Sequence, residues 1–229
     1  MRIKALIIGC TGTKLSAEEI KFIGEIKPWG LILFRRNIID PSQIKALTSH
    51  FREIVGRPNA PVLIDQEGGR VQRMGPPHWR KYPAAAQYLK ASRGNVNEAA
   101  QLARLSSRLI AQDLGDCGIN VDCMPVLDCP VIGSNDAIGD RAYASEPEAI
   151  SQIGRAAAQG MLDGGVLPII KHMPGHGRAM VDSHYALPVV KEPIDILENT
   201  DFYPFKRLND LPLAMTGHIV FDAIDPTGP

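Results

Sequence analysis

The feature that most constrains the fold is a short apolar run followed by a longer amphipathic segment, repeated along the chain. The apolar runs are Ala5–Ile8, Leu31–Phe34, Val62–Ile64, Ile119–Asp122, Val166–Ile170 and Leu213–Thr216. They lack strict alternation of apolar and polar residues, which is typical of strands buried on both faces of a parallel sheet. Because strand and helix alternate without a Ser/Gly-rich linker, we expect a single α/β domain over residues 1–229.

The segments between the runs carry signals for helix starts. Ser16 and Ser145 are each followed three residues later by a glutamate, the spacing of a capping box. Asp40-Pro41 places a capping side chain before a proline at the first helical position. One buried helical stripe is predicted at spacings of three and four residues: Ile44, Leu47, Phe51 and Val55. Further helices are expected over residues 98–113 and 148–163.

Two architectures contain such a sheet, the doubly wound open sheet and the (β/α)8 barrel. The first run is followed by residues 9–13, GCTGT, which do not form a GxGxxG fingerprint, and the chain has no P-loop motif. Polar side chains instead follow the ends of several runs: Arg35, Asp65, Asp128, Lys171, His172 and His218. A barrel enzyme has its active site at this end of the strands. The pattern therefore favours a (β/α)8 TIM-type barrel.

Charge and cysteine content narrow the class of ligand and the compartment. Lys+Arg and Asp+Glu both number 25, so we expect no nucleic-acid or acidic-membrane partner, since these need a basic face. The four cysteines form no CxxC pair and are expected to be small buried hydrophobes. The apolar run Ala5–Ile8 is shorter than the roughly 7–15 residues of a signal-peptide core. No window approaches the about 18 apolar residues of a membrane span, so we expect a cytoplasmic protein.

The segment from Lys171 to Pro188 is the richest in chemistry. It begins where a predicted strand ends, and its proline and glycines predict a loop over the sheet. Asp182 lies two residues before His184, where a carboxylate can accept the imidazole N–H, fix its tautomer and stabilise its charged form. Such a pair suits proton transfer near neutral pH. A metal site built from His172, His176 and Asp182 is the alternative, but the glycines remove the helix that would align the two histidines.

Three motifs in this order resemble glycoside hydrolase family 3, in its β-N-acetylglucosaminidase branch. They are IDQEGGRVQR at residues 64–73, GDRAY at residues 139–143, and KHMPGHG at residues 171–177 with DSH at residues 182–184. The resemblance covers essentially the whole chain. It implies a retaining exo-glycosidase that removes terminal β-linked N-acetylglucosamine from peptidoglycan fragments during cell-wall recycling, with no cofactor. A metal site is not expected either, for the reason given above.

The resemblance also implies roles for individual residues. His184 matches the general acid/base of this branch, and Asp182 matches the carboxylate paired with it. Five further positions match residues that hold the amino sugar: Asp65, Arg73, Arg141, Lys171 and His172. Glu67 and Arg70 are expected to form a structural ion pair, and His176 to organise the loop.

One part of the family pattern is not found in this sequence. Family members carry an aspartate nucleophile after the seventh strand, whereas about six βα units are predicted here. We therefore expect a barrel truncated after about six units, with the nucleophile beyond Pro229. The open sheet is expected to be covered by a partner copy, by residues 202–229 or by a missing C-terminal fragment, because unpaired strand edges are unfavourable.

Two other functions remain open at this point. One is a catalytically inactive remnant that binds sugar without the nucleophile. The other is a family 3 glucosidase. The loop with Asp182 and His184 argues against it, because the resemblance links that loop to the β-N-acetylglucosaminidase branch. Turnover of an aryl N-acetylglucosaminide separates the enzyme from the remnant.

Overall fold

A six-stranded, all-parallel sheet forms the centre of the molecule, whose computed structural model describes residues 3–181 and 186–229. In spatial order its strands are β1 (Lys4–Ile8), β2 (Pro28–Leu33), β3 (Val62–Ile64), β6 (Val121–Asp122), β7 (Leu167–Met173) and β9 (Leu213–Thr216). Each predicted apolar run is a strand of this sheet, and each strand is parallel to its neighbours. The expected parallel α/β fold is confirmed.

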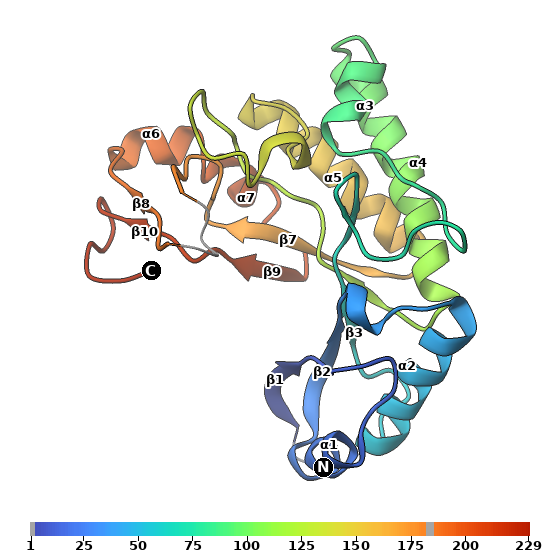
Figure 1. The fold of residues 1–229 in the computed structure, drawn as a ribbon. Coiled ribbons are helices and arrows are strands. Elements are labelled where there is room, and N and C mark those ends of the chain that lie inside the picture. Colours follow the sequence, from blue (N-terminus) through green and yellow to red (C-terminus); the bar gives the residue numbers. More distant parts are fainter. Residues whose placement is uncertain (1–2, 182–185) are drawn as a thin grey trace.

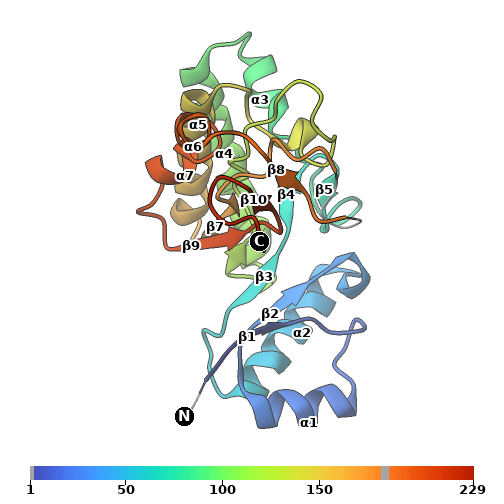
Figure 2. The same ribbon diagram turned by 90° about the vertical axis from the view of Figure 1, so that its left-hand side faces the viewer.

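Helices connect the successive strands. They are α1 (Ala17–Ile26), α2 (Pro41–Val55), α3 (Ala86–Ala91), α4 (Val96–Gly115), α5 (Pro147–Asp163), α6 (Ile194–Asn199) and α7 (Tyr203–Arg207). Two short 3-10 turns, η1 (Arg35–Asn37) and η2 (Gly139–Arg141), lie in connecting loops. In Figures 1 and 2, α2, α4 and α5 lie along one side of the curved sheet. The sheet with its helices corresponds to the first six units of a (β/α)8 barrel.

Two small sheets accompany the main one. Directly after β3, β4 (Gln66–Gly68) and β5 (Val71–Gln72) pair antiparallel. Further along, β8 (Val189–Val190) pairs in parallel with β10 (Val220–Phe221). The first pair bends the chain back over the end of β3 and so places the IDQEGGRVQR segment beside the C-terminal ends of the strands.

The predicted helix starts hold at two of three places. Ser16 caps α1 in a complete capping box with Glu19, and Asp40 caps α2 through the backbone N–H of Gln43. The capping box predicted at Ser145 is wrong: α5 begins at Pro147, its N-cap is Glu146, and no side chain caps it. The proline fixes φ for the first helical position and needs no partner for an N–H, so the helix starts there without the serine.

Both faces of the sheet are apolar. On β2, Leu31 and Leu33 are buried in the core shared with the helices, whereas Ile32 between them belongs to a cluster with Leu63. The predicted stripe on α2 is buried against that helical core. All four cysteines are buried and free, as expected of small hydrophobes.

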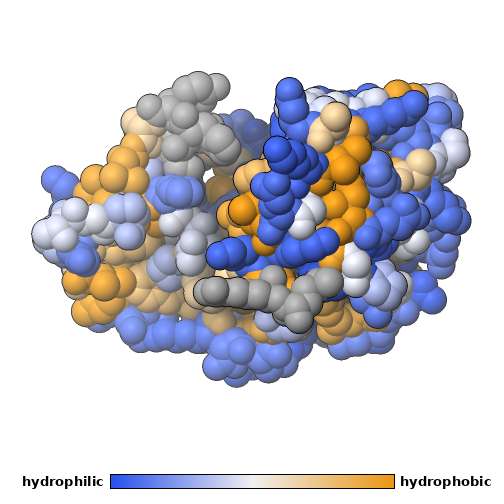
Figure 3. Space-filling view, turned by 90° about the horizontal axis from the view of Figure 1, so that it is seen from below, coloured by the Kyte–Doolittle hydropathy of each residue, from blue (hydrophilic) through white to orange (hydrophobic). Residues whose placement is uncertain are grey.

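The sheet is open in the described part of the chain, where β1 pairs with β2 alone and β9 with β7 alone. Apolar side chains of the β1 region are exposed, among them Leu6 and Ile7, and the face seen from below has orange apolar areas between blue hydrophilic ones (Figure 3). Of the three covers expected for the gap, residues 202–229 do not provide one, since they add no strand to either edge beyond β9 itself. Their strand β10 pairs with β8 instead, and Phe202 and Phe221 pack together. Within the described residues, no helix is both long and apolar enough to cross a membrane.

Candidate active site

The C-terminal ends of the strands surround a cavity of about 860 Å³. All five residues predicted to bind the sugar line it: Asp65, Arg73, Arg141, Lys171 and His172. They come from three separate stretches of sequence, and parallel strands bring them together because their carboxyl ends lie at one edge of the sheet. The predicted convergence on one pocket is therefore observed.

Asp65 follows β3 and is held by two cations. Its Oδ1 accepts a hydrogen bond from Lys171 Nζ at 2.9 Å, and its Oδ2 accepts one from Arg73 Nη2 at 3.2 Å. Burial alone would raise the pKa of Asp65, but Lys171 and Arg73 hold it below its ordinary value. The cavity thus contains a fixed carboxylate acceptor beside an Arg73 whose Nε has no partner among the described residues.

Glu67 lies beneath the cavity and pairs with two cations of the site. Arg141 donates to both of its carboxylate oxygens at 2.8 Å, and Lys171 Nζ lies 2.6 Å from Oε1. The expected ion pair between Glu67 and Arg70 is wrong, since Arg70 pairs with Asp140 at 2.9 Å. β4 turns Glu67 toward the buried side, where it aligns Arg141 and Lys171.

The His172 ring is hydrogen-bonded to the completely buried carboxylate of Asp128. Asp128 Oδ2 lies 2.6 Å from His172 Nδ1, and Asp128 Oδ1 accepts from the backbone N–H groups of His172 and His176 at 3.2 and 2.7 Å. Burial alone would raise the pKa of Asp128, but His172 and these N–H groups hold it below its ordinary value. His176 also lines the cavity, and its backbone N–H is one of the donors to Asp128; the loop-organising role of its side chain stays a prediction.

A second buried carboxylate, Asp122, lies at the end of β6. Its Oδ1 accepts from the backbone N–H of Gln66 at 2.9 Å, and its Oδ2 has no partner among the described residues. Burial raises the pKa of Asp122 to about 8, and the negative charges of Asp65 and Glu67 add to this, whereas Lys171 opposes it. Asp122 is therefore mainly a neutral acid at neutral pH.

The predicted acid/base pair, Asp182 and His184, lies outside the described residues. The same holds for Asp182 as a third ligand in the alternative metal site. His172 and His176 have ring centroids 5.9 Å apart, and within residues 3–181 and 186–229 no three His, Cys, Asp or Glu side chains are placed to hold a metal ion.

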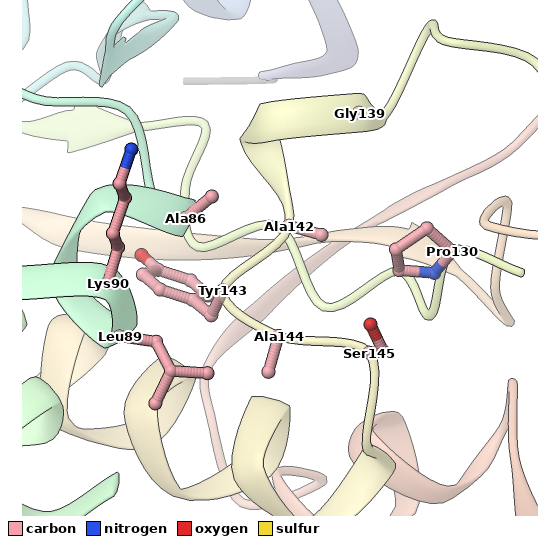
Figure 4. A pocket seen from close by; sticks show the side chains of 9 residues that line it. All are labelled: Ala86, Leu89, Lys90, Pro130, Gly139, Ala142, Tyr143, Ala144 and Ser145. Carbon is pink, nitrogen blue, oxygen red and sulfur yellow. The ribbon is translucent and has the colours of Figure 1, made fainter. Parts of the chain in front are cut away.

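A second, smaller hollow of about 380 Å³ lies on another side of the segment that carries Arg141. In Figure 4, Lys90 lies at one side of it and Pro130 and Ser145 at the other, with the Tyr143 ring between them. Alanines form much of the remaining lining, and the described residues around it include no carboxylate or histidine. The charged groups suited to catalysis lie in the larger cavity.

Asp128, His218 and Glu67 are among the residues of the site that were not assigned to it from the sequence. Asp128 and His218 follow apolar runs, so their strand-end position was a usable signal. His218 lines the cavity. Glu67 lies within the IDQEGGRVQR motif, but nothing local indicates that its partners are 74 and 104 residues away.

This fold and site agree with the family that the chain matches. Residues 2–229 match the model of the glycosyl hydrolase family 3 N terminal domain, and the chain belongs to this family. The beta-hexosaminidase of Alkalilimnicola ehrlichii is 38% identical over 99% of this chain and 65% of its own length. That of Methylobacillus flagellatus is 34% identical over 98% of this chain and 64% of its own length. The chain thus spans slightly less than two thirds of these curated relatives.

Solved structures share this fold. NagZ from Neisseria gonorrhoeae in complex with N-trifluoroacetyl-D-glucosamine superposes with a TM-score of 0.90 at 32% identity, over 97% of this chain and 66% of that one. A family 3 β-N-acetylglucosaminidase from Paenibacillus sp. str. FPU-7 gives a TM-score of 0.88 at 30% identity, over 97% and 42% of the two chains.

Proposed function

We propose that this protein is a retaining exo-β-N-acetylglucosaminidase. The observation that carries the proposal is the meeting of Asp65, Arg73, Arg141, Lys171 and His172 around one cavity. A carboxylate acceptor and several cationic donors in this arrangement suit the hydroxyls and the acetamido oxygen of an amino sugar. A structural relative that superposes closely on this chain was crystallised with an N-acylated glucosamine.

The chemistry we propose proceeds through a covalent glycosyl-enzyme intermediate and an oxocarbenium-like transition state. His184 protonates the leaving oxygen and then takes a proton from the attacking water, with Asp182 as its paired carboxylate. Among the described residues that line the cavity, the one carboxylate is Asp65, and Lys171 and Arg73 engage it. We therefore assign the nucleophile to an aspartate in the part of the family's length that this sequence does not span.

The proposed substrate is a cell-wall fragment with a terminal β-linked N-acetylglucosamine, degraded in the cytoplasm during peptidoglycan recycling. This rests on the resemblance of the motifs to the β-N-acetylglucosaminidase branch. Mass spectrometry of muropeptides before and after incubation tests it through loss of one N-acetylglucosamine.

The decisive assay compares two chromogenic substrates on the protein expressed from its complete gene. Release of 4-nitrophenol from the N-acetyl-β-glucosaminide but not from the β-glucoside supports the proposal. The reverse preference identifies a family 3 glucosidase. Binding of N-acetylglucosamine without turnover of either substrate identifies the inactive remnant.

A further inference from the structure

Asp128 hydrogen-bonds both the His172 ring and the backbone of residues 172–176. The side chain is fully buried, and its hydrogen bonds within the described chain are with two backbone N–H groups and with the His172 ring. One oxygen holds the backbone N–H groups of His172 and His176, and the other faces His172 Nδ1 at 2.6 Å. A single carboxylate therefore holds both the loop backbone and the His172 ring in position.

The charge state of Asp128 decides which ring nitrogen carries the proton. The pKa of Asp128 is held below its ordinary value, so it is a carboxylate that can only accept. A neutral imidazole has one N–H, and facing a carboxylate it places that hydrogen on Nδ1. Nε2 is then without hydrogen. Within the described chain no group hydrogen-bonds Nε2, and the ring lines the cavity.

The other polar groups of the cavity show why an acceptor at His172 Nε2 matters. Lys171, Arg73 and Arg141 can only donate, and Asp65 is already engaged by two of them. Asp65 can still accept through its remaining lone pairs, but a terminal amino sugar has several free hydroxyls, so a hydroxyl out of reach of Asp65 needs a further acceptor. We propose that Asp128 is a positioning residue that fixes His172 as the Nδ1–H tautomer, so that His172 Nε2 accepts a hydrogen bond from one hydroxyl of the bound sugar. The sugar part rests on the proposed function, whereas the tautomer part does not.

Asp128→Asn separates this role from a structural one. The amide oxygen can take the place of Oδ1 and accept both backbone N–H groups, which turns the amide NH2 toward His172 Nδ1. Nδ1 must then accept, and the ring proton moves to Nε2. The shape of the site is kept while the polarity of Nε2 is reversed.

Two readouts test the proposal. The first is the 15N spectrum of the imidazole nitrogens over a pH series, with the His172 signals assigned by their loss in His172→Gln. We expect a protonated Nδ1 and a bare Nε2 in the neutral ring of the wild type, and the reverse in Asp128→Asn. A wild-type ring protonated on Nε2 would overturn the proposal, and this observation does not depend on whether Asp128→Asn folds.

The second readout is affinity for N-acetylglucosamine and its 3-, 4- and 6-deoxy analogues. We expect Asp128→Asn to weaken binding of the parent sugar about 10- to 100-fold, because an N–H would then face a donating hydroxyl. One deoxy analogue should lose affinity in the wild type but not in the variant. Equal losses in both proteins would refute the hydroxyl contact. If the wild type binds none of these sugars, the proposed function fails while the tautomer result stands.

Discussion

Lys171 Nζ lies 2.6 Å from Glu67 Oε1, and both side chains are almost completely buried. The same ammonium group also reaches Asp65 at 2.9 Å. Burial alone would lower the pKa of Lys171, but Glu67 and Asp65 hold it above its ordinary value. One cation thus compensates two carboxylates at the cavity, and the geometry of the proposed sugar site depends on it.

Removing this cation should destabilise the protein strongly. Lys171→Met keeps an unbranched side chain of similar length but leaves buried carboxylates under-compensated, at a cost of about 3–5 kcal/mol in the free energy of unfolding. Urea denaturation measures this change. Lys206→Met is the matched control, because Lys206 pairs with Glu198 at the surface, where such pairs contribute less than about 1 kcal/mol. Equal losses in the two variants would contradict the assigned role of Lys171.

Gly177 of the KHMPGHG motif should tolerate no side chain. A Cβ there would lie 2.1 Å from the carbonyl oxygen of Cys129, so Gly177→Ala must displace backbone. We expect a loss of about 1–3 kcal/mol in unfolding free energy together with weakened sugar binding. Gly115→Ala, at the end of α4 with no atom within 4 Å of the new Cβ, should be neutral or slightly stabilising. Thermal unfolding and sugar titration of both variants provide the comparison, and a normal Gly177→Ala protein would rule out the close approach.

Asp122 should make stability decrease as the pH rises. Its pKa is about 8 in the folded protein and about 3.9 in an unfolded chain, so between these values the folded state holds the extra proton. Across this window the unfolding free energy should fall by up to about 1.4 kcal/mol per pH unit from this group. Asp122→Asn keeps an oxygen acceptor for Gln66 N–H but cannot ionise. Its stability relative to the wild type should therefore grow from pH 5 to pH 8.

Urea denaturation at several pH values measures that difference. Asp65, Glu67 and Lys171 face Asp122 and remain unchanged in the variant. Asp163→Asn is the control, because the pKa of Asp163 is lowered, chiefly by Gln159 and Arg104, and it stays ionised across the window. Parallel curves for wild type and Asp122→Asn would show that Asp122 is ionised in the folded state.

His184→Ala tests the acid/base assignment. General acid catalysis contributes roughly 10²–10⁴-fold, so kcat should fall by that factor on a substrate with a poor leaving group. On a nitrophenyl substrate the loss should be smaller, since that leaving group departs with little protonation. His78→Ala, an exposed histidine that does not line the cavity, should leave both rates unchanged. Similar losses on both substrates would exclude His184 as the proton donor.

Local patterns in the sequence were sufficient for the strands, two helix starts and the family. The six apolar runs became the six strands of the sheet. Burial on both faces explains the continuous apolar residues of the inner strands, whereas β1 and β9, at the open edges, are apolar although much of their surface is exposed. The side chains of Ser16 and Asp40 each accept a hydrogen bond from the backbone N–H three residues further along, so these caps could be predicted from local sequence. The capping box predicted at Ser145 was wrong because α5 begins at Pro147, two residues further along the chain.

The pairing of charges was decided by the tertiary structure alone. Sequence proximity suggested Arg70 for Glu67, but β4 turns Glu67 inward to Arg141 and Lys171, and Arg70 meets Asp140. The bond between Asp128 and His172 joins residues 44 positions apart, and no local rule predicts it. Sequence patterns report interactions within a few residues, whereas these partners are set by which strand ends meet at one edge of the sheet.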